Sequence, residues 1–276
     1  MATKVVENLL GLDGEELANY VRDRVIDLEI SANDKEERLP VVKEGFISKK
    51  TEIKPGEMFF VGYCMEGIDY LAFAKYIKES KDSDITSLII RTGNYVKGYF
   101  DYDVYAKRED TRADFLLDLA MKELGTDDWI DVVERGYVAS INCLRNIGQA
   151  VCIEHSVLMQ NLLSFLGIDV TCLSMISLED AKFSGHSANV IHVSTGEVVK
   201  HLYYDLINME VTKNGDRTVL MPTVKLISDE DYVAFLNGAK PLIVERQNCF
   251  KKDGKFVTQY FPKTIKNIAT LQKTLG

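Results

Sequence analysis

The sequence predicts an α+β fold, in which a block of helices precedes a block of antiparallel strands. Residues 112–166 carry long apolar patterns with helical spacing. Residues 169–224 carry short β-branched and aromatic runs that alternate with polar turns. Helices and strands that come in separate blocks, rather than in alternation, are typical of α+β proteins. The 276 residues are enough for one large domain or two small ones.

The sequence predicts that residues 1–108 form an N-terminal α/β region, which is either an accessory lobe or part of a single domain with the rest of the chain. Residues 31–57 are polar and predict loops, with Pro40 and Pro55 as breakers. The expected elements are a helix at 14–29, a strand at 58–63, a helix at 68–79, a strand at 87–91 and a strand pair at 95–105. The charged run at 107–112 marks the boundary.

The sequence predicts that residues 109–276 form the core of the protein. Residues 125–128, Gly-Thr-Asp-Asp, supply a helix stop followed by a helix start. The expected helices are 112–124, 127–145, one that starts near Cys152 and closes at Gly167, 228–237 and 263–273. The expected strands are 169–176, 186–194, 198–206 and 217–224.

Composition and charge exclude several classes of protein. The chain is 46% hydrophobic and 27% charged, as in ordinary globular proteins, and its net charge of -9 disfavours nucleic-acid partners. It carries no apolar run of membrane-spanning length and no signal-peptide pattern at its start, so we expect a cytoplasmic protein without a membrane partner. The five scattered cysteines, without metal-ligand spacing, predict reduced thiols and no zinc site. Nothing in the pattern indicates an oligomeric state.

Cys152 is the candidate nucleophile. A loop-like stretch with Gly148 precedes it, and an apolar helical run follows, so Cys152 is expected at a helix N-terminus. Unpaired N–H groups and the helix dipole favour a thiolate there and can hold an oxyanion. Glu154 is expected to be a first-turn acid. A structural cysteine is the alternative for this position, as it is for each of the other four thiols.

His186 is the candidate base. It starts a strand, and a strand end can present an imidazole to a helix N-terminus that is packed against it. The rival histidines are His155, His192 and His201. His155 is one helical turn from Cys152, where alignment with the thiol is harder, and the other two lie further along the strands.

Asp205 is the candidate partner of His186. It follows a β-run, and a neighbouring antiparallel strand can set its carboxylate beside the imidazole to hold the ring. An aspartate at a strand end or turn is the simpler alternative. Asn146 and Gln149, just before Cys152, are candidate side-chain donors to an oxyanion, and an ordinary polar loop residue is the simpler alternative for each.

These residues resemble the core of the transglutaminase-like superfamily of papain-type thiol enzymes. Over residues 146–206 the order matches: a helix-heading Cys, a small residue four positions on, a Leu-Leu-x-x-Leu-Gly-Ile closure, and strands with His and Asp. The matching positions are Cys152, Ser156, Leu162 to Ile168, Gly185-His186 and Tyr204-Asp205. The resemblance implies a papain-like core with the nucleophile helix packed on an antiparallel sheet.

The same resemblance implies a function. Cys152 would be the nucleophile, His186 the base and Asp205 its orienter, in acyl transfer at a peptide or glutamine-type amide through a thioester. No cofactor or metal is expected, and the partner would be a protein or peptide substrate. Two positions depart from the family: Ala188 stands where members often carry Trp, and Gly148 lies four residues before the thiol. The missing Trp favours the alternative function, a non-catalytic scaffold with this fold that acts as a protein-interaction module.

Overall fold

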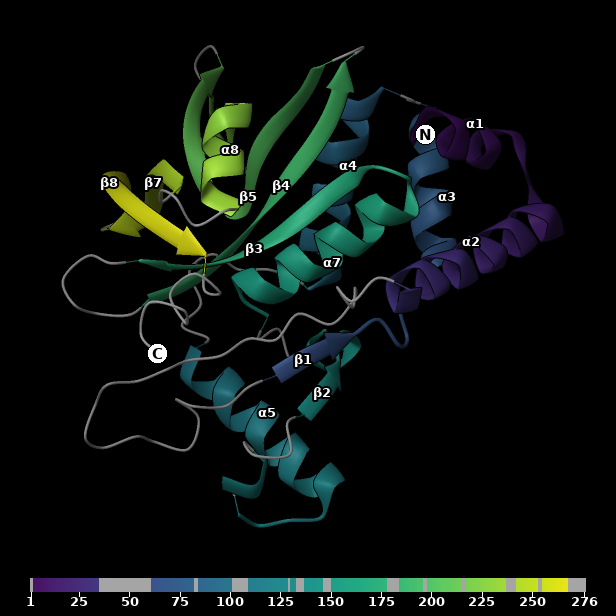
Figure 1. Ribbon diagram of the computed structural model, residues 1–276. Helices are drawn as coiled ribbons and strands as arrows, with labels where there is room; N and C mark the ends of the chain where they lie inside the picture. The colour runs from purple at the N-terminus through teal and green to yellow at the C-terminus, as the bar shows by residue number, and fades with distance from the viewer. Residues whose placement is uncertain are drawn as a thin grey trace. The chain divides into compact units, whose positions relative to one another are not determined.

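The computed structural model describes residues 2–34, 61–81, 84–100, 109–128, 130–132, 137–145, 150–177, 184–195, 198–214, 217–236, 242–252 and 255–267 (Figure 1). The chain divides into two compact units, which are described separately. We call the first the helical unit (Met1–Tyr102, Arg108–Ala150 and Val157–Asp169) and the second the sheet unit (Asp103–Lys107, Val151–Ser156 and Val170–Gly276). The division that the sequence predicts near residue 108 stays a prediction.

The helical unit contains most of the helices. Its elements are α1 (Ala2–Gly11), α2 (Gly14–Asp34), β1 (Val61–Cys64), α3 (Tyr70–Ser80), α4 (Ile85–Tyr99), α5 (Glu109–Leu124), β2 (Tyr137–Ser140), the 3-10 helix η2 (Ile141–Leu144) and most of α7 (Cys152–Phe165). Asp69 and Asp84 cap α3 and α4, since their carboxylates accept hydrogen bonds from Ala72 N at 2.8 Å and Ser87 N at 2.9 Å. The predicted helices at 14–29, 68–79 and 112–124 are confirmed.

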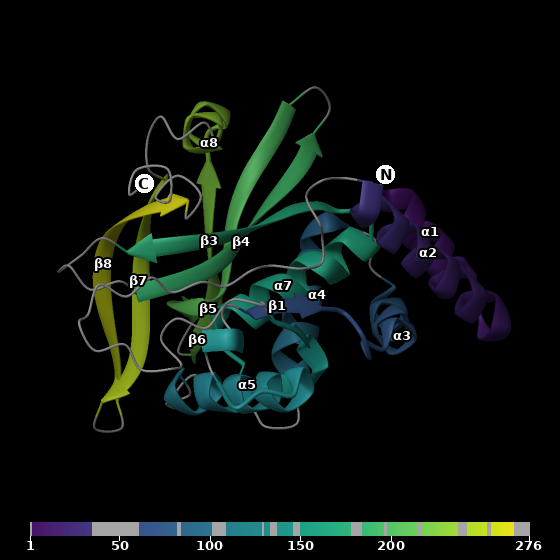
Figure 2. The same cartoon turned by 60° about the horizontal axis from the view of Figure 1, so that its bottom comes forward.

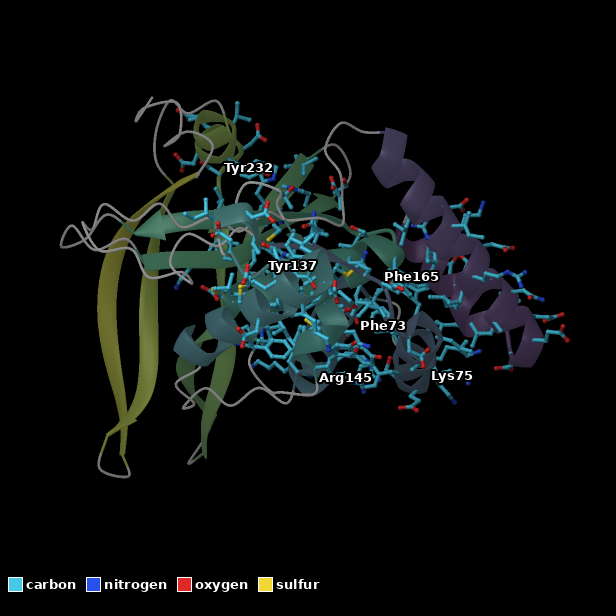
Figure 3. The ribbon with its side chains drawn as sticks, turned by 90° about the horizontal axis from the view of Figure 1, so that it is seen from below. Phe73, Lys75, Tyr137, Arg145, Phe165 and Tyr232 are labelled. Carbon is cyan, nitrogen blue, oxygen red and sulfur yellow. The ribbon has the colours of Figure 1, made fainter. Side chains whose placement is uncertain are left out.

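The body of α7 is anchored in the helical unit. Arg24 of α2 donates to the carbonyl oxygens of Phe165 at 3.1 Å and Ser164 at 3.2 Å, which lie at the C-terminal end of the helix. The ring of Phe165 lies 5.4 Å from that of Tyr70 and 6.1 Å from that of Phe73 (centroid distances; Phe73 and Phe165 are labelled in Figure 3). These contacts bury the apolar end of α7.

Two predictions for the helical unit are wrong. Residues 87–91 and 95–99, predicted as strands, belong to α4. Their β-branched and aromatic residues favour strands locally, but Leu88, Thr92 and Val96 recur every four residues and are all buried, so the helical period prevails. Residues 101–105, and residues 35–57 of the predicted loop, lie outside the described residues.

The predicted helix at 127–145 is also wrong over its second half. Residues 137–140 form β2, which pairs in parallel with β1 in the register Val61↔Tyr137 to Cys64↔Ser140. Ser140 then caps η2 by accepting from Asn142 N at 3.2 Å. The strand partner lies more than 70 residues away in the sequence, so local spacing does not reveal it.

The sheet unit contains a six-stranded sheet in the order β6-β5-β4-β3-β8-β7. Its elements are β3 (Asp169–Ser177), β4 (Ser184–Thr195), β5 (Val198–Asn214), β6 (Arg217–Ile227), α8 (Asp229–Leu236), β7 (Leu242–Lys252) and β8 (Lys255–Asn267). The β4–β5, β5–β6, β7–β8 and β3–β8 pairs are antiparallel. The four predicted strands and the predicted helix at 228–237 are confirmed.

The β7–β8 hairpin, coloured yellow in Figure 2, was not predicted. It pairs residue for residue from Leu242↔Ile265 to Lys252↔Lys255. The helix expected at 263–273 is therefore wrong for residues 263–267, which complete β8, because pairing with β7 and β3 outweighs local helical spacing. Residues 268–273 lie outside the described residues.

The predicted α+β class is confirmed, with helices packed on an antiparallel sheet. The first turn of α7 is bonded to β4, and α8 contacts β5. Within the described residues, no helix combines the length and the apolar character needed to cross a membrane.

Candidate active site

Cys152 is the first residue of α7, as the sequence predicts. The N–H of Val151 donates to Glu154 Oε2 at 2.7 Å, so the acid in the first turn binds back to the residue before the helix. This is the second half of a capping box, and it fixes where the helix begins. Glu154 is fully buried, whereas the Cys152 thiol is half-buried. The expected first-turn role of Glu154 is confirmed.

The far end of α7 closes as the sequence predicts. Gly167 adopts a left-handed φ of 77°, which a residue without a side chain reaches at little cost. Its N–H donates to Ser164 O at 2.9 Å, and the N–H of Ile168 donates to Leu163 O at 3.0 Å. These two bonds are those of a Schellman motif, so both ends of the Cys152 helix are defined.

A second thiol, Cys172 on β3, lies within electrostatic range of Cys152. Burial, followed by the charge of Cys152, raises the pKa of Cys172 to about 12. Cys172 therefore keeps its proton at neutral pH, and a protonated thiol is a poor nucleophile. The side chain of Cys172 is partly exposed, so it is less buried than the sequence predicts, but its raised pKa fits a structural cysteine rather than a nucleophile.

Asn189 ties the first turn of α7 to the sheet. Its side chain is fully buried, and its Nδ2 donates to the carbonyl oxygen of Ser156 at 2.9 Å. On the sheet, Asn189 pairs with Tyr204 of β5. The start of the Cys152 helix, strand β4 and strand β5 therefore meet around this residue.

Asp205 is fully buried in β5, one residue beyond the Tyr204–Asn189 pair. Its Oδ2 accepts from the hydroxyl of Tyr203 at 2.9 Å, and its Oδ1 accepts from the N–H of Ile207 at 3.2 Å. Strand β5 continues beyond the predicted end at 206, and its register with β6 shifts between Asp205 and Met209. Asp205 thus lies inside the strand, at a shift in its pairing with β6, rather than at a strand end.

His186 lies in β4, the neighbour of β5, so the expected adjacency of the two strands is confirmed. The side chain of His186 lies outside the described side chains, and Asn146 and Gln149 lie outside the described residues. The arrangement of Cys152, His186 and Asp205 as a triad stays a prediction.

The three rival histidines have partners elsewhere. His155 is fully buried, and its Nδ1 donates to Val151 O at 2.7 Å, within its own helix. His192 and His201, which we call the histidine pair, have their Nδ1 atoms 2.8 Å apart.

The histidine pair lies beneath α8. Asp229 Oδ1 is 2.9 Å from His201 Nε2, and Thr171 Oγ1 is 3.1 Å from His192 Nε2. The Tyr232 ring, labelled in Figure 3, stacks on His201 at 4.4 Å. The two histidine rings therefore help to attach α8 to the sheet.

Sequence reasoning missed Asn189 and Tyr203. Asn189 is a polar residue within an otherwise apolar part of β4, which is a signal that its side chain needs a buried partner. Tyr203 stands two residues before Asp205, so strand alternation puts both side chains on one face. Neither signal identifies the partner atom.

Two further observations bear on identity. Among the residues that the structure describes, no group of three or more His, Cys, Asp or Glu side chains is arranged to hold a metal ion. Comparison of the chain with protein-family models, with curated proteins and with solved structures found no match.

Proposed function

We propose that the protein is a thiol-dependent enzyme with a transglutaminase-like core, which transfers an acyl group from a peptide or glutamine-type amide through a thioester. The observation that carries the proposal is the position of Cys152. Cys152 is the first residue of a capped helix, and the first turn of this helix is hydrogen-bonded to the strand that holds His186. Nucleophile and base then stand on rigid elements that are joined to each other, as catalysis requires.

In the proposed reaction, His186 takes the proton of the Cys152 thiol and the thiolate attacks the amide carbonyl carbon. Asp205 accepts the other ring N–H of His186 and stabilises the imidazolium. The tetrahedral intermediate collapses when the C–N bond breaks, and His186 returns its proton to the leaving amine. A thioester on Cys152 remains.

The oxyanion would be held at the N-terminus of α7. The first N–H groups of a helix lack carbonyl partners within it, and the helix dipole favours negative charge there. The side chains of Asn146 and Gln149 are the additional candidate donors. Donors of this kind, fixed before the reaction, contribute a large share of the rate in acyl transfer.

The acceptor of the acyl group decides the class of reaction. Water gives a protease or amidase, or a deamidase when the amide is a glutamine side chain, and an amine gives a cross-linking enzyme. These outcomes share one acyl-enzyme, so the triad is compatible with all of them. Mass spectrometry of protein substrates incubated with and without a primary amine would separate cleavage, deamidation and amine incorporation.

The proposal is tested most directly by thiol alkylation. Iodoacetamide at about pH 6, where ordinary thiols are protonated, should label Cys152 alone because His186 stabilises its thiolate. His186→Ala should slow this labelling, and the matched variant His155→Ala should not, because the His155 ring is bound within its own helix. Rapid labelling that depends on His155 and not on His186 would overturn the assignment of the base.

A scaffold without catalysis is the second candidate, and Ala188 favours it. This fully buried residue stands where the resembled family often has Trp, so one wall of a substrate cleft would be reduced. A scaffold needs no activated thiol. Uniformly slow alkylation of every cysteine at about pH 6, in a folded protein, would favour this candidate.

A further inference from the structure

The hydroxyl of Tyr203 is hydrogen-bonded to the Asp205 carboxylate. The Tyr203 side chain is fully buried, and the hydroxyl donates to Asp205 Oδ2 at 2.9 Å. Tyr203 and Asp205 are two residues apart in β5 and so project from the same face of the strand. A buried phenol hydroxyl needs a partner, and an ionised carboxylate is a strong one.

The other oxygen of the same carboxylate accepts a hydrogen bond from the backbone. The N–H of Ile207 donates to Asp205 Oδ1 at 3.2 Å, within the segment where the register with β6 shifts. Each carboxylate oxygen therefore accepts a hydrogen bond from within β5: Oδ2 from the residue two positions before Asp205, and Oδ1 from the residue two positions after it. Because these two donors belong to the same strand as Asp205, they restrain the orientation of the carboxylate locally.

We infer that Tyr203 is a positioning residue for the proposed acyl transfer, and this inference rests on the proposed function. A carboxylate offers about four lone-pair directions, so it can accept a ring N–H in addition to the Tyr203 hydroxyl and the Ile207 N–H. These two bonds hold the plane of the carboxylate in the orientation in which it would accept the ring N–H of His186 on the neighbouring strand. Without the hydroxyl, Asp205 can rotate away from the imidazole.

The test compares the rate of Cys152 alkylation by iodoacetamide at about pH 6 in the wild type and in Tyr203→Phe, which removes only the hydroxyl. We expect a loss of about tenfold, the order of one hydrogen bond to a charged group. Tyr99→Phe is the matched control. It removes another buried tyrosine hydroxyl, which donates to Asn142 Oδ1 at 2.6 Å in the helical unit, and it should leave the rate unchanged.

A second arm separates positioning from a structural role. If Tyr203 acts through Asp205, then Tyr203→Phe should cause no further loss in an Asp205→Asn background. The same tenfold loss in both backgrounds, or a wild-type rate in Tyr203→Phe, would overturn the inference while leaving the proposed function intact. If wild-type alkylation does not depend on His186, the proposed function fails and the inference fails with it. Circular dichroism checks that each variant is folded.

Discussion

At the residue scale, two neighbouring thiols are expected to behave in opposite ways. Cys152 heads a helix, whereas burial raises the pKa of Cys172 to about 12. Cys152→Ala should abolish turnover and leave the fold intact, because the cap of α7 is formed by Glu154 and Val151. Turnover assays with Cys172→Ala and Cys143→Ala supply the controls. An equal loss of turnover in either, with folding unchanged, would contradict the assignment of the nucleophile.

Asp205 is expected to orient His186 rather than to bind metal. Asp205→Asn should lower the acylation rate on the order of 10²-fold, because an amide holds the ring in the wrong tautomer and cannot stabilise its charge. Single-turnover kinetics measure this rate. A chelator should leave the wild type unaffected. A fully active Asp205→Asn enzyme, or chelator inactivation that a divalent metal reverses, would rule out this role.

The site could be predicted from the sequence only in part. The position of Cys152 and the role of Glu154 follow from helix capping rules, which depend on neighbours in the chain. The Asn189–Ser156 and Tyr203–Asp205 bonds depend on which atoms the sheet brings together. A sequence pattern shows that a buried polar group needs a partner, but it does not specify the partner.

At the scale of elements, α4 shows how burial overrides local preference. Its β-branched and aromatic residues suggested strands, but the Asp84 cap and a buried face with helical spacing make it a helix. Its last turn contains Lys97, a half-buried lysine. Burial of Lys97 lowers its pKa from 10.5 to about 8.

This shift predicts a pH-dependent stability. The folded state releases the Lys97 proton more readily than the unfolded state, so stability should rise as the pH rises from about 8 to about 10.5. Lys97→Met keeps the length of the side chain and removes the charge. It should therefore raise the free energy of unfolding at pH 7 by on the order of 1 kcal/mol, after allowance for partial exposure. Urea unfolding at neutral and alkaline pH measures this gain, and a destabilised variant at neutral pH would contradict the prediction.

At the scale of the whole molecule, α7 is shared between the two units. Its first turn, including Cys152, belongs to the sheet unit, and the residues from Val157 onward belong to the helical unit. The class of the fold was predictable because long helical patterns and successive strands are local signals. The pairing of β2 with β1 and the β7–β8 hairpin could not be predicted, because strand pairing depends on contacts between segments and not on the local pattern of either one.

The sharing of α7 predicts how a truncated chain behaves. A fragment of residues 109–276 lacks Arg24, Tyr70 and Phe73, which bind the C-terminal half of the helix. We expect this fragment to lose helix content and cooperative unfolding, as measured by circular dichroism during heating. A fragment that unfolds cooperatively and keeps rapid Cys152 labelling would instead confirm residues 109–276 as an independent core.

The histidine pair has a consequence for tautomers. Asp229 can only accept, so His201 must carry its proton on Nε2, and its Nδ1 is then the acceptor for the proton on His192 Nδ1. The Nε2 of His192 is left to accept the hydroxyl proton of Thr171. In this series of three hydrogen bonds, every donor therefore points in the same direction, from Thr171 on β3 toward Asp229 on α8. When each ring carries a single proton, this arrangement makes the two rings opposite tautomers, and nitrogen-15 chemical shifts should show one imidazole protonated at Nδ1 and the other at Nε2.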